Sequence, residues 1–147
     1  MPNQAIAAPP LLERDVPVLV FGGPYSNLQA TEALLVEAVR RGIAPENIIC
    51  TGDVVAYAAD PQACCDLIRT SDMAVVMGNC KEALAAGAED CGCGFDADSE
   101  CAALSSQWYA YTSSRVDRRT CDWMATLPAR LDLQIGGTRL AVIHGGN

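Results

Sequence analysis

Short apolar runs alternate with helical patterns along most of the chain. Residues 16–21 (VPVLVF), 48–51 (IICT) and 73–77 (MAVVM) are each of strand length and each lead into a glycine-containing turn. The continuous apolar run over residues 16–21 is typical of a strand buried on both faces of a sheet. Helical spacing follows each run, so the pattern predicts three strand–helix units and a parallel sheet.

The helices that follow these strands have recognisable starting residues. Ser26 or Asn27 can cap the helix that begins at Leu28, because a short polar side chain accepts a hydrogen bond from the first helical turn. Asp60, followed by a proline, opens the second helix. A third helix is expected near residues 82–86. These starts support the strand–helix rhythm.

The second half of the chain departs from that rhythm. Residues 87–98 contain alternating glycine and cysteine and predict an irregular loop. Helices are expected over residues 99–114 and 117–126. Two alternating segments, 130–135 and 138–143, flank a Gly-Gly pair and predict a β-hairpin. The whole pattern indicates an α/β fold with parallel βα units and a terminal hairpin.

The sequence suggests an N-terminal tail followed by one domain. Residues 1–15 are rich in proline and alanine and lack the basic and apolar regions of a secretory signal, so a flexible N-terminal tail is expected there. Residues 16–147 have the size of a single domain. The longest apolar runs are far shorter than a membrane span, so no membrane association is expected. We expect a cytoplasmic protein.

The charge balance narrows the class of ligand. Ten Lys and Arg stand against eighteen Asp and Glu, which gives a net charge of −8. Binding to a nucleic-acid backbone requires a positively charged surface, so no polynucleotide partner is expected. A small phosphorylated substrate remains compatible, because a metal ion or a helix N-terminus can neutralise phosphate locally.

The eight cysteines do not form an obvious disulfide framework. Several, including Cys50, Cys64 and Cys121, lie inside apolar patterns and are expected to pack as small hydrophobic residues. Cys91 and Cys93 could hold a structural zinc ion together with Cys101, and with Cys80 as a further candidate, although their spacing is not the usual Cys-x2-Cys. The simpler interpretation is that these are free thiols.

Polar chemistry gathers in the loops that end the strands. Asp53 follows the second strand, Asn79 the third and His144, the only histidine in the chain, the last. In parallel α/β sheets, ligands bind where such loops converge. A carboxylate, an amide oxygen and an imidazole form a hard-to-borderline metal site. Asp53 and Asn79 are also ordinary turn formers, so a purely structural role for each is the alternative.

A specific resemblance is carried by the same loops. The ordered blocks are GGPYSNLQATEALL, TGDVVAYAADPQACCDLIR, MGNCKEAL and LPARLDLQIGGTRLAVIHGG. In this order they resemble the calcineurin-like metallophosphoesterases of the small bacterial phosphodiesterase type. The resemblance implies an αββα sandwich, two bound metals, and the motif series Asp-x-His, Gly-Asp, Gly-Asn-His, His and Gly-His-x-His.

The resemblance assigns a role to each position. Asp53 corresponds to the carboxylate that bridges two metals, and Asn79 and His144 to ligands of the second metal. The first motif falls at Gly23 and Tyr25, which do not supply the ligands expected for the first metal. The resemblance therefore implies one site for a divalent transition metal (Mn, Fe or Zn) rather than two.

Two further positions near the site differ from the family pattern. Cys80 stands where the family has the histidine thought to act as general acid, so Cys80 is a candidate catalytic residue or soft metal ligand. Tyr25 could donate its hydroxyl to a phosphate, and filling of the vacated site by its ring is the alternative interpretation.

Two functions follow from these assignments. The first is a metal-dependent phosphohydrolase, acting on a phosphodiester or a phosphomonoester through one metal. The second is a non-catalytic module that binds a phosphorylated ligand or a protein partner through the same loops. Family members continue to the Gly-His-x-His motif, so a C-terminally truncated domain is expected over residues 16–147. Its unpaired sheet edge could support self-association.

Overall fold

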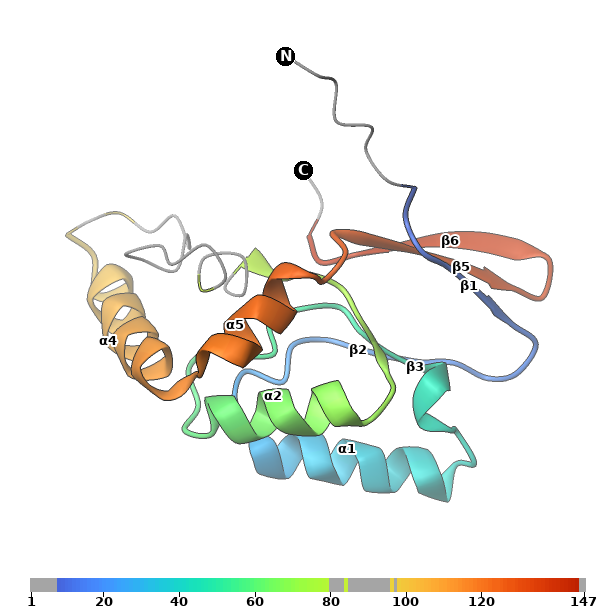
Figure 1. Ribbon diagram of the computed structural model, residues 1–147, viewed down its shortest axis with the longest axis horizontal. Helices are drawn as coiled ribbons and strands as arrows, with labels where there is room; N and C mark the ends of the chain where they lie inside the picture. Colours follow the sequence, from blue (N-terminus) through green and yellow to red (C-terminus); the bar gives the residue numbers. More distant parts are fainter. Residues whose placement is uncertain (1–7, 80–83, 85–95, 97, 146–147) are drawn as a thin grey trace, which may run out of the picture.

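The computed structural model describes residues 8–79, 84, 96 and 98–145 (Figure 1). Its helices are α1 (Leu28–Arg40), α2 (Pro61–Thr70), α4 (Glu100–Arg115) and α5 (Arg118–Ala125), with a 3-10 helix η1 (Pro45–Asn47). Its strands are β1 (Leu11–Arg14), β2 (Leu19–Phe21), β3 (Ile48–Cys50), β4 (Ala74–Val75), β5 (Arg130–Ile135) and β6 (Thr138–Ile143).

The strand–helix units build the predicted parallel sheet. Its order is β2-β3-β4, and both strand pairs are parallel. All three residues of the central strand β3 are buried, because its two faces meet different layers. The side chains of Ile48 and Cys50 pack in the core between this sheet and the helices, whereas Ile49 packs in the core between the two sheets. The run over residues 16–21, which was expected to be buried on both faces, forms β2 instead with Val20 48% exposed, because β2 lies at the edge of this sheet and β3 at its centre.

The second sheet has the order β1-β5-β6 and contains the predicted hairpin. Strands β5 and β6 pair antiparallel from Arg130↔Ile143 to Ile135↔Thr138. The connecting residues Gly136 and Gly137 have φ values of 52° and 82°. A two-residue turn of this kind needs positive φ at both positions, and glycine adopts it without a steric penalty.

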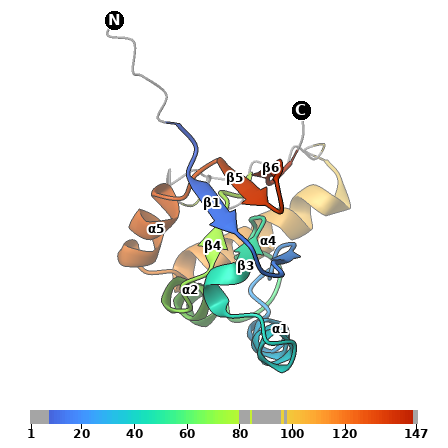
Figure 2. The ribbon, with the colours of Figure 1, turned by 90° about the vertical axis from the view of Figure 1, so that its right-hand side faces the viewer.

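The molecule is layered, and the layers are held by two apolar clusters. One cluster joins sheet β2-β3-β4 to side chains from α1, α2, α4 and α5. The other lies between the sheets and includes Ile49, Val76, Leu131 and Leu133. Figure 2 shows the β1-β5-β6 sheet above the other sheet, with α1 and α2 below. The α/β class expected from the sequence is confirmed.

The expected flexible tail over residues 1–15 needs a correction. Residues 11–14 form β1, which pairs parallel with β5. Leu12 packs against the cluster between the sheets, and the Asp132 amide donates to the Pro10 carbonyl at 2.9 Å. The Pro/Ala-rich composition therefore concealed a short alternating segment, whose partner strand lies more than a hundred residues away in the sequence.

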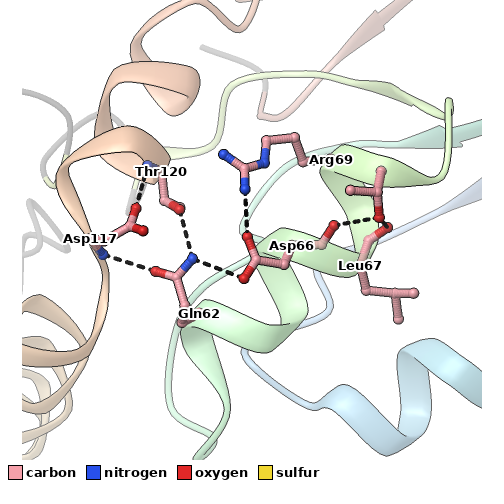
Figure 3. Close-up of polar contacts among 7 residues, drawn as sticks. Gln62, Asp66, Leu67, Arg69, Asp117 and Thr120 are labelled. Carbon is pink, nitrogen blue, oxygen red and sulfur yellow. Dashed lines mark hydrogen bonds and ion pairs between the residues drawn. The ribbon is translucent and has the colours of Figure 1, made fainter.

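Helix α5 is fixed to α2 through one glutamine (Figure 3). Gln62 Nε2 donates to Thr120 Oγ1 at 2.9 Å and to Asp66 Oδ2 at 3.1 Å. Its Oε1 accepts from the Asp117 amide at 2.8 Å. The Asp117 carboxylate in turn accepts from the Thr120 amide, and the hydrogen bonds from Thr120 lower the Asp117 pKa. The side chain of Gln62 thus satisfies groups at the start of α5.

Asp132 is a buried carboxylate held by two arginines of the second sheet. Its side chain is 2% exposed, with Arg130 Nε 2.8 Å from Oδ1 and Arg139 Nη2 2.6 Å from Oδ2. The hydrogen bond from Arg130, followed by that from Arg139, lowers the Asp132 pKa. The charged form is thereby favoured in the folded state.

This pair of bonds predicts a pH dependence of stability. Because the folded pKa of Asp132 is lowered, its contribution is present above the unfolded pKa of about 3.9 and is lost as the pH falls through the folded value. Wild type should therefore be more stable than Asp132→Asn at pH 7, with the difference shrinking below about pH 4. Urea denaturation at several pH values measures this. The exposed Asp122→Asn is the control, and an equal pH dependence in Asp132→Asn and wild type would contradict the prediction.

The described cysteines divide by burial. Cys50, Cys64 and Cys65 are fully buried in the helical core, as expected of small hydrophobic residues. Cys121 is only half-buried, and burial raises the pKa of its thiol. Cys101 is exposed on α4.

Several predictions fall on residues that the structure does not describe. Cys80, Cys91 and Cys93 lie outside the described residues, as do most of the helix expected near residues 82–86 and of the loop over 87–98. The roles suggested for these cysteines stay predictions. Among the helices of the described part, none has both the length and the apolar character needed to cross a bilayer.

Candidate metal centre

The structure brings together the three residues selected as metal ligands. Asp53 follows β3, Asn79 follows β4, and His144 follows β6. The His144 Nε2 atom lies 3.0 Å from Asn79 Oδ1 and 3.3 Å from Asp53 Oδ2. Two of the residues come from neighbouring parallel strands, as the strand-end argument requires, and the histidine arrives from the hairpin of the other sheet.

The other ring nitrogen fixes how the histidine faces the site. His144 Nδ1 lies 2.9 Å from the Thr51 carbonyl oxygen, which can only accept, so Nδ1 is the donor. Nε2 is then left facing the two oxygens of Asn79 and Asp53. Two arrangements follow. In the first, Nε2 carries a proton that it shares between the two oxygens; in the second, lone pairs of Nε2, Asn79 Oδ1 and Asp53 Oδ2 converge on one region. The second arrangement suits a cation, and a backbone carbonyl on Nδ1 is the usual support of a metal-binding histidine.

The donor set is that of a small, incomplete metal site. The Asp53 and His144 side chains are 11% and 28% exposed, so the site opens to one side. Among the described residues, no three or more His, Cys, Asp and Glu side chains lie together in a way that could hold a metal ion. The third donor is therefore the amide of Asn79. One carboxylate, one amide and one imidazole fit a divalent ion whose remaining positions go to water or substrate.

Two glycines give the site its close packing. A Cβ atom on Gly78 would collide with the Asp53 amide nitrogen and Oδ1. One on Gly52, whose φ is 122°, would collide with His144 Nδ1 and lie 3.0 Å from the Gly78 Cα atom. Any side chain at these positions would displace a candidate ligand. The glycine before each polar residue is therefore a condition of the geometry.

Gly23, which stands at the first-motif carboxylate position, faces the same region. A Cβ atom there would lie 2.8 Å from the Asp53 carbonyl oxygen and 2.9 Å from Asp53 Cβ. This backbone thus has no room for an aspartate at position 23. The Tyr25 amide donates to the Asp53 carbonyl at 3.1 Å, while the Tyr25 ring contacts Tyr57. Neither Gly23 nor Tyr25 therefore offers a metal-binding side chain toward Asp53.

The loops around the site hold several residues in a backbone conformation that is unusual for non-glycine residues. Positive φ values occur at Tyr25 (53°), Ser26 (59°), Asp53 (44°) and Tyr57 (30°). Such conformations cost on the order of 1–3 kcal/mol each and persist only where the surroundings impose them. Here the loop after β2 and the loop after β3 are joined by hydrogen bonds from Tyr25 N to Asp53 O, Ser26 N to Val54 O, Ala58 N to Tyr25 O and Asp60 N to Ser26 O.

Ser26 links these loops through its side chain as well. It is fully buried, and its Oγ accepts from the Ala56 amide at 3.1 Å. Ser26→Ala leaves that amide without its partner, so we expect the free energy of unfolding to fall by about 1–3 kcal/mol. Ser106→Ala, at an exposed serine of α4 that bonds to a helical carbonyl, is the control. Equal urea midpoints for the two variants would contradict the prediction.

The comparisons place this fold and site in a family. A model of the calcineurin-like phosphoesterase family matches residues 16–147. The chain belongs to this family. The match covers the loops that carry Asp53, Asn79 and His144. It confirms the resemblance drawn from the sequence blocks, and members of this family generally depend on divalent metals.

One solved structure agrees with this assignment, and two other proteins are similar to the chain. A metallophosphoesterase from Sphaerobacter thermophilus is 26% identical with a TM-score of 0.55, covering 78% of this chain and 42% of that one. Protein PH1004 from Pyrococcus horikoshii is 18% identical with a TM-score of 0.60, covering 84% and 52%, and supports the fold alone. Uncharacterized protein MJ0912 from Methanocaldococcus jannaschii is 40% identical over 62 residues, which are 42% of this chain and 25% of that protein.

The chain thus spans from a quarter to about half of the length of these relatives. The C-terminal truncation of the domain over residues 16–147 stays a prediction. The metal-binding roles of Asp53, Asn79 and His144 likewise stay predictions, although their convergence is observed.

Sequence reasoning missed three contributors to the site. Thr51 acts through its backbone carbonyl, which no side-chain motif reveals. Ser26 was considered only as a helix cap, but Asn27 is the cap, accepting from the Ala30 amide at 3.0 Å. Tyr57 was not considered, because a tyrosine inside a turn carries no signal of a positive φ.

Proposed function

We propose that this chain is part of a metal-dependent phosphohydrolase that binds one divalent cation through Asp53, Asn79 and His144. The observation that supports this most is the orientation of His144: its Nδ1 donates to the Thr51 carbonyl, and its Nε2 faces oxygens of the other two residues. A neutral imidazole that donates through Nδ1 keeps a lone pair on Nε2, and this lone pair together with the two oxygens suits a bound cation.

The protein's own groups prepare the site for a phosphate ester. The Thr51 carbonyl orients the imidazole, and the buried segment Val54–Ala56 anchors Asp53 in the core. A bound divalent ion would supply positive charge that polarises a phosphoryl oxygen. Tyr25, whose side chain is 41% exposed at the neighbouring loop, is the candidate donor to a substrate oxygen.

One metal rather than two is supported by Gly23. It offers no ligand, and the Asp53 backbone occupies the space beside it. One nitrogen donor and two oxygen donors suit Mn, Fe or Zn. A single ion lacks the paired clamp on attacking and leaving oxygens, so slow turnover is part of the proposal.

The proposed substrate is a small phosphorylated molecule. A net charge of −8 opposes binding of a polynucleotide backbone. A core that contains three buried cysteines suits a reducing compartment, so we place the protein in the cytoplasm.

Hydrolysis of one generic phosphodiester and one phosphomonoester, with Mn, Fe or Zn and with a chelator, tests the proposal. We expect metal-dependent turnover that Asp53→Asn lowers by about 100-fold, because replacing a ligand carboxylate weakens the binding of the cation that polarises the phosphoryl oxygen. Asp122→Asn, at a carboxylate that is 62% exposed on α5, should have no effect. Turnover that is equal in both variants would refute the assignment.

The second candidate is a non-catalytic module that binds a phosphorylated ligand. The observation that favours it is again Gly23, because loss of the first site removes much of the catalytic apparatus. Metal-dependent binding of a phosphate ester without any turnover would support this candidate over the hydrolase.

A further inference from the structure

A pocket of about 310 Å³ lies beside the candidate metal centre. It begins at Gly23 and Tyr25, the two residues that contact Asp53 from the loop after β2. Its walls are largely apolar and include Phe21, Pro24 and Leu34. A volume of this order is that of a small-molecule site, and apolar walls with few polar groups are the usual lining.

Two tyrosines form one side of the pocket. Tyr25 and Tyr57 both line it, and their side chains are 41% and 61% exposed. Their ring centroids lie 5.4 Å apart at an angle of 44°. Tyr57 also packs edge-to-face with Trp108, at 5.3 Å between ring centroids. Both tyrosines are therefore exposed at the pocket instead of being used to fill the core.

These rings are held in place by their backbone. Both tyrosines have positive φ, and the loops that carry them are joined through Tyr25, Asp53 and Ala58. A rigid aromatic side chain loses little conformational freedom when a ligand packs against it. The pocket is thus ready to receive a flat group without rearrangement.

We propose that this pocket binds an aromatic ring carried by the phosphate ester, so that the substrates are esters of aromatic or nucleoside alcohols instead of aliphatic ones. The inference rests on the proposed function for the position of the phosphate near Asp53. The ring itself is recognised by stacking and edge contacts with Tyr25 and Tyr57, which are specific to aromatic groups.

The test measures the alcohol half of the ester alone, with a chelator present, so that neither metal nor turnover affects the result. Benzyl alcohol and cyclohexylmethanol are similar in size and differ in aromaticity, and adenosine represents a nucleoside. Dissociation constants come from NMR titrations of the full chain. We expect benzyl alcohol to bind more tightly than cyclohexylmethanol by about tenfold, a factor typical of ring stacking on an aromatic side chain.

Variants of Tyr57 assign that preference to the pocket. Tyr57→Leu should reduce the preference to near unity, whereas Tyr57→Phe should keep it to within about twofold, because the ring remains. Tyr111→Leu, at a half-exposed tyrosine of α4 outside the pocket, should also keep it. Each ratio is measured within one variant, so a general change in stability does not mimic the effect.

The outcomes separate this inference from the proposed function. Equal binding of the two small alcohols, or a preference that survives in Tyr57→Leu, or one that is lost in Tyr111→Leu, would overturn the inference. Tighter binding of adenosine than of benzyl alcohol would identify a nucleobase as the ring, and the reverse order a small aryl group. Aromatic binding without metal-dependent hydrolysis would leave the pocket established and refute the hydrolase alone.

Discussion

His144→Ala is expected to lower the affinity for Mn²⁺ or Zn²⁺ by about 100-fold or more, since even partners that only orient a metal ligand contribute about 10–100-fold. The imidazole is the one nitrogen donor of the candidate site, and its Nε2 faces both Asn79 and Asp53. Calorimetric titration of the purified chain, after treatment with a chelator, measures the effect. His144 is the only histidine in the sequence, so no other imidazole can substitute.

Two further variants test whether the loss of affinity is specific to the candidate site. Asp53→Ala should lower the affinity similarly, while Asp122→Ala, at an exposed carboxylate, should not. Circular dichroism of each variant shows whether the fold is kept. If His144→Ala and Asp53→Ala both bind metal as tightly as wild type, the site does not lie where we place it.

Gly78→Ala should disable the site without removing any donor. The added methyl group would collide with the Asp53 amide nitrogen and Oδ1, so Asp53 must move. Overpacking of this kind typically costs about 1–3 kcal/mol of stability. We also expect metal affinity to fall, because the carboxylate is displaced from His144. Urea denaturation and metal titration measure the two effects.

Gly22→Ala is the matched control for that substitution. Gly22 follows β2, and a Cβ atom there would meet nothing within 4 Å. It should change stability and metal affinity little. Similar losses in Gly22→Ala and Gly78→Ala would show that the strand-end loops are sensitive in general, and that the close approach to Asp53 is not the cause.

Local sequence patterns predicted which segments form helices and strands better than they predicted which strands pair. The run around Ile48–Cys50 identified a short strand, and the Gly-Gly pair identified the hairpin. The run over residues 16–21 was expected to be buried on both faces, but it forms the partly exposed edge strand β2. The strand Leu11–Arg14 was missed, because its alternation is short and follows two prolines. Its pairing with β5 depends on a contact between distant segments, which no local window of sequence contains.

The candidate site was predictable where it follows from strand ends and side-chain chemistry. Asp53 and Asn79 follow adjacent parallel strands, so their proximity could be expected. The support of His144 by Thr51 could not, because every residue has a carbonyl. Crowding around Gly23 was equally hidden, since it arises from the path of the Asp53 backbone.

The packing of Trp108 gives this protein an internal optical reporter. Trp108 is only 8% exposed, and its ring packs edge-to-face with Tyr57, whose other aromatic neighbour is Tyr25. A ligand that shifts Tyr57 must alter the surroundings of the indole, and hence its emission. The chain has one other tryptophan, Trp123 on α5. The difference between wild-type and Trp108→Phe spectra therefore isolates the signal, and the arrival of a ligand beside the metal centre can be followed in time without a label.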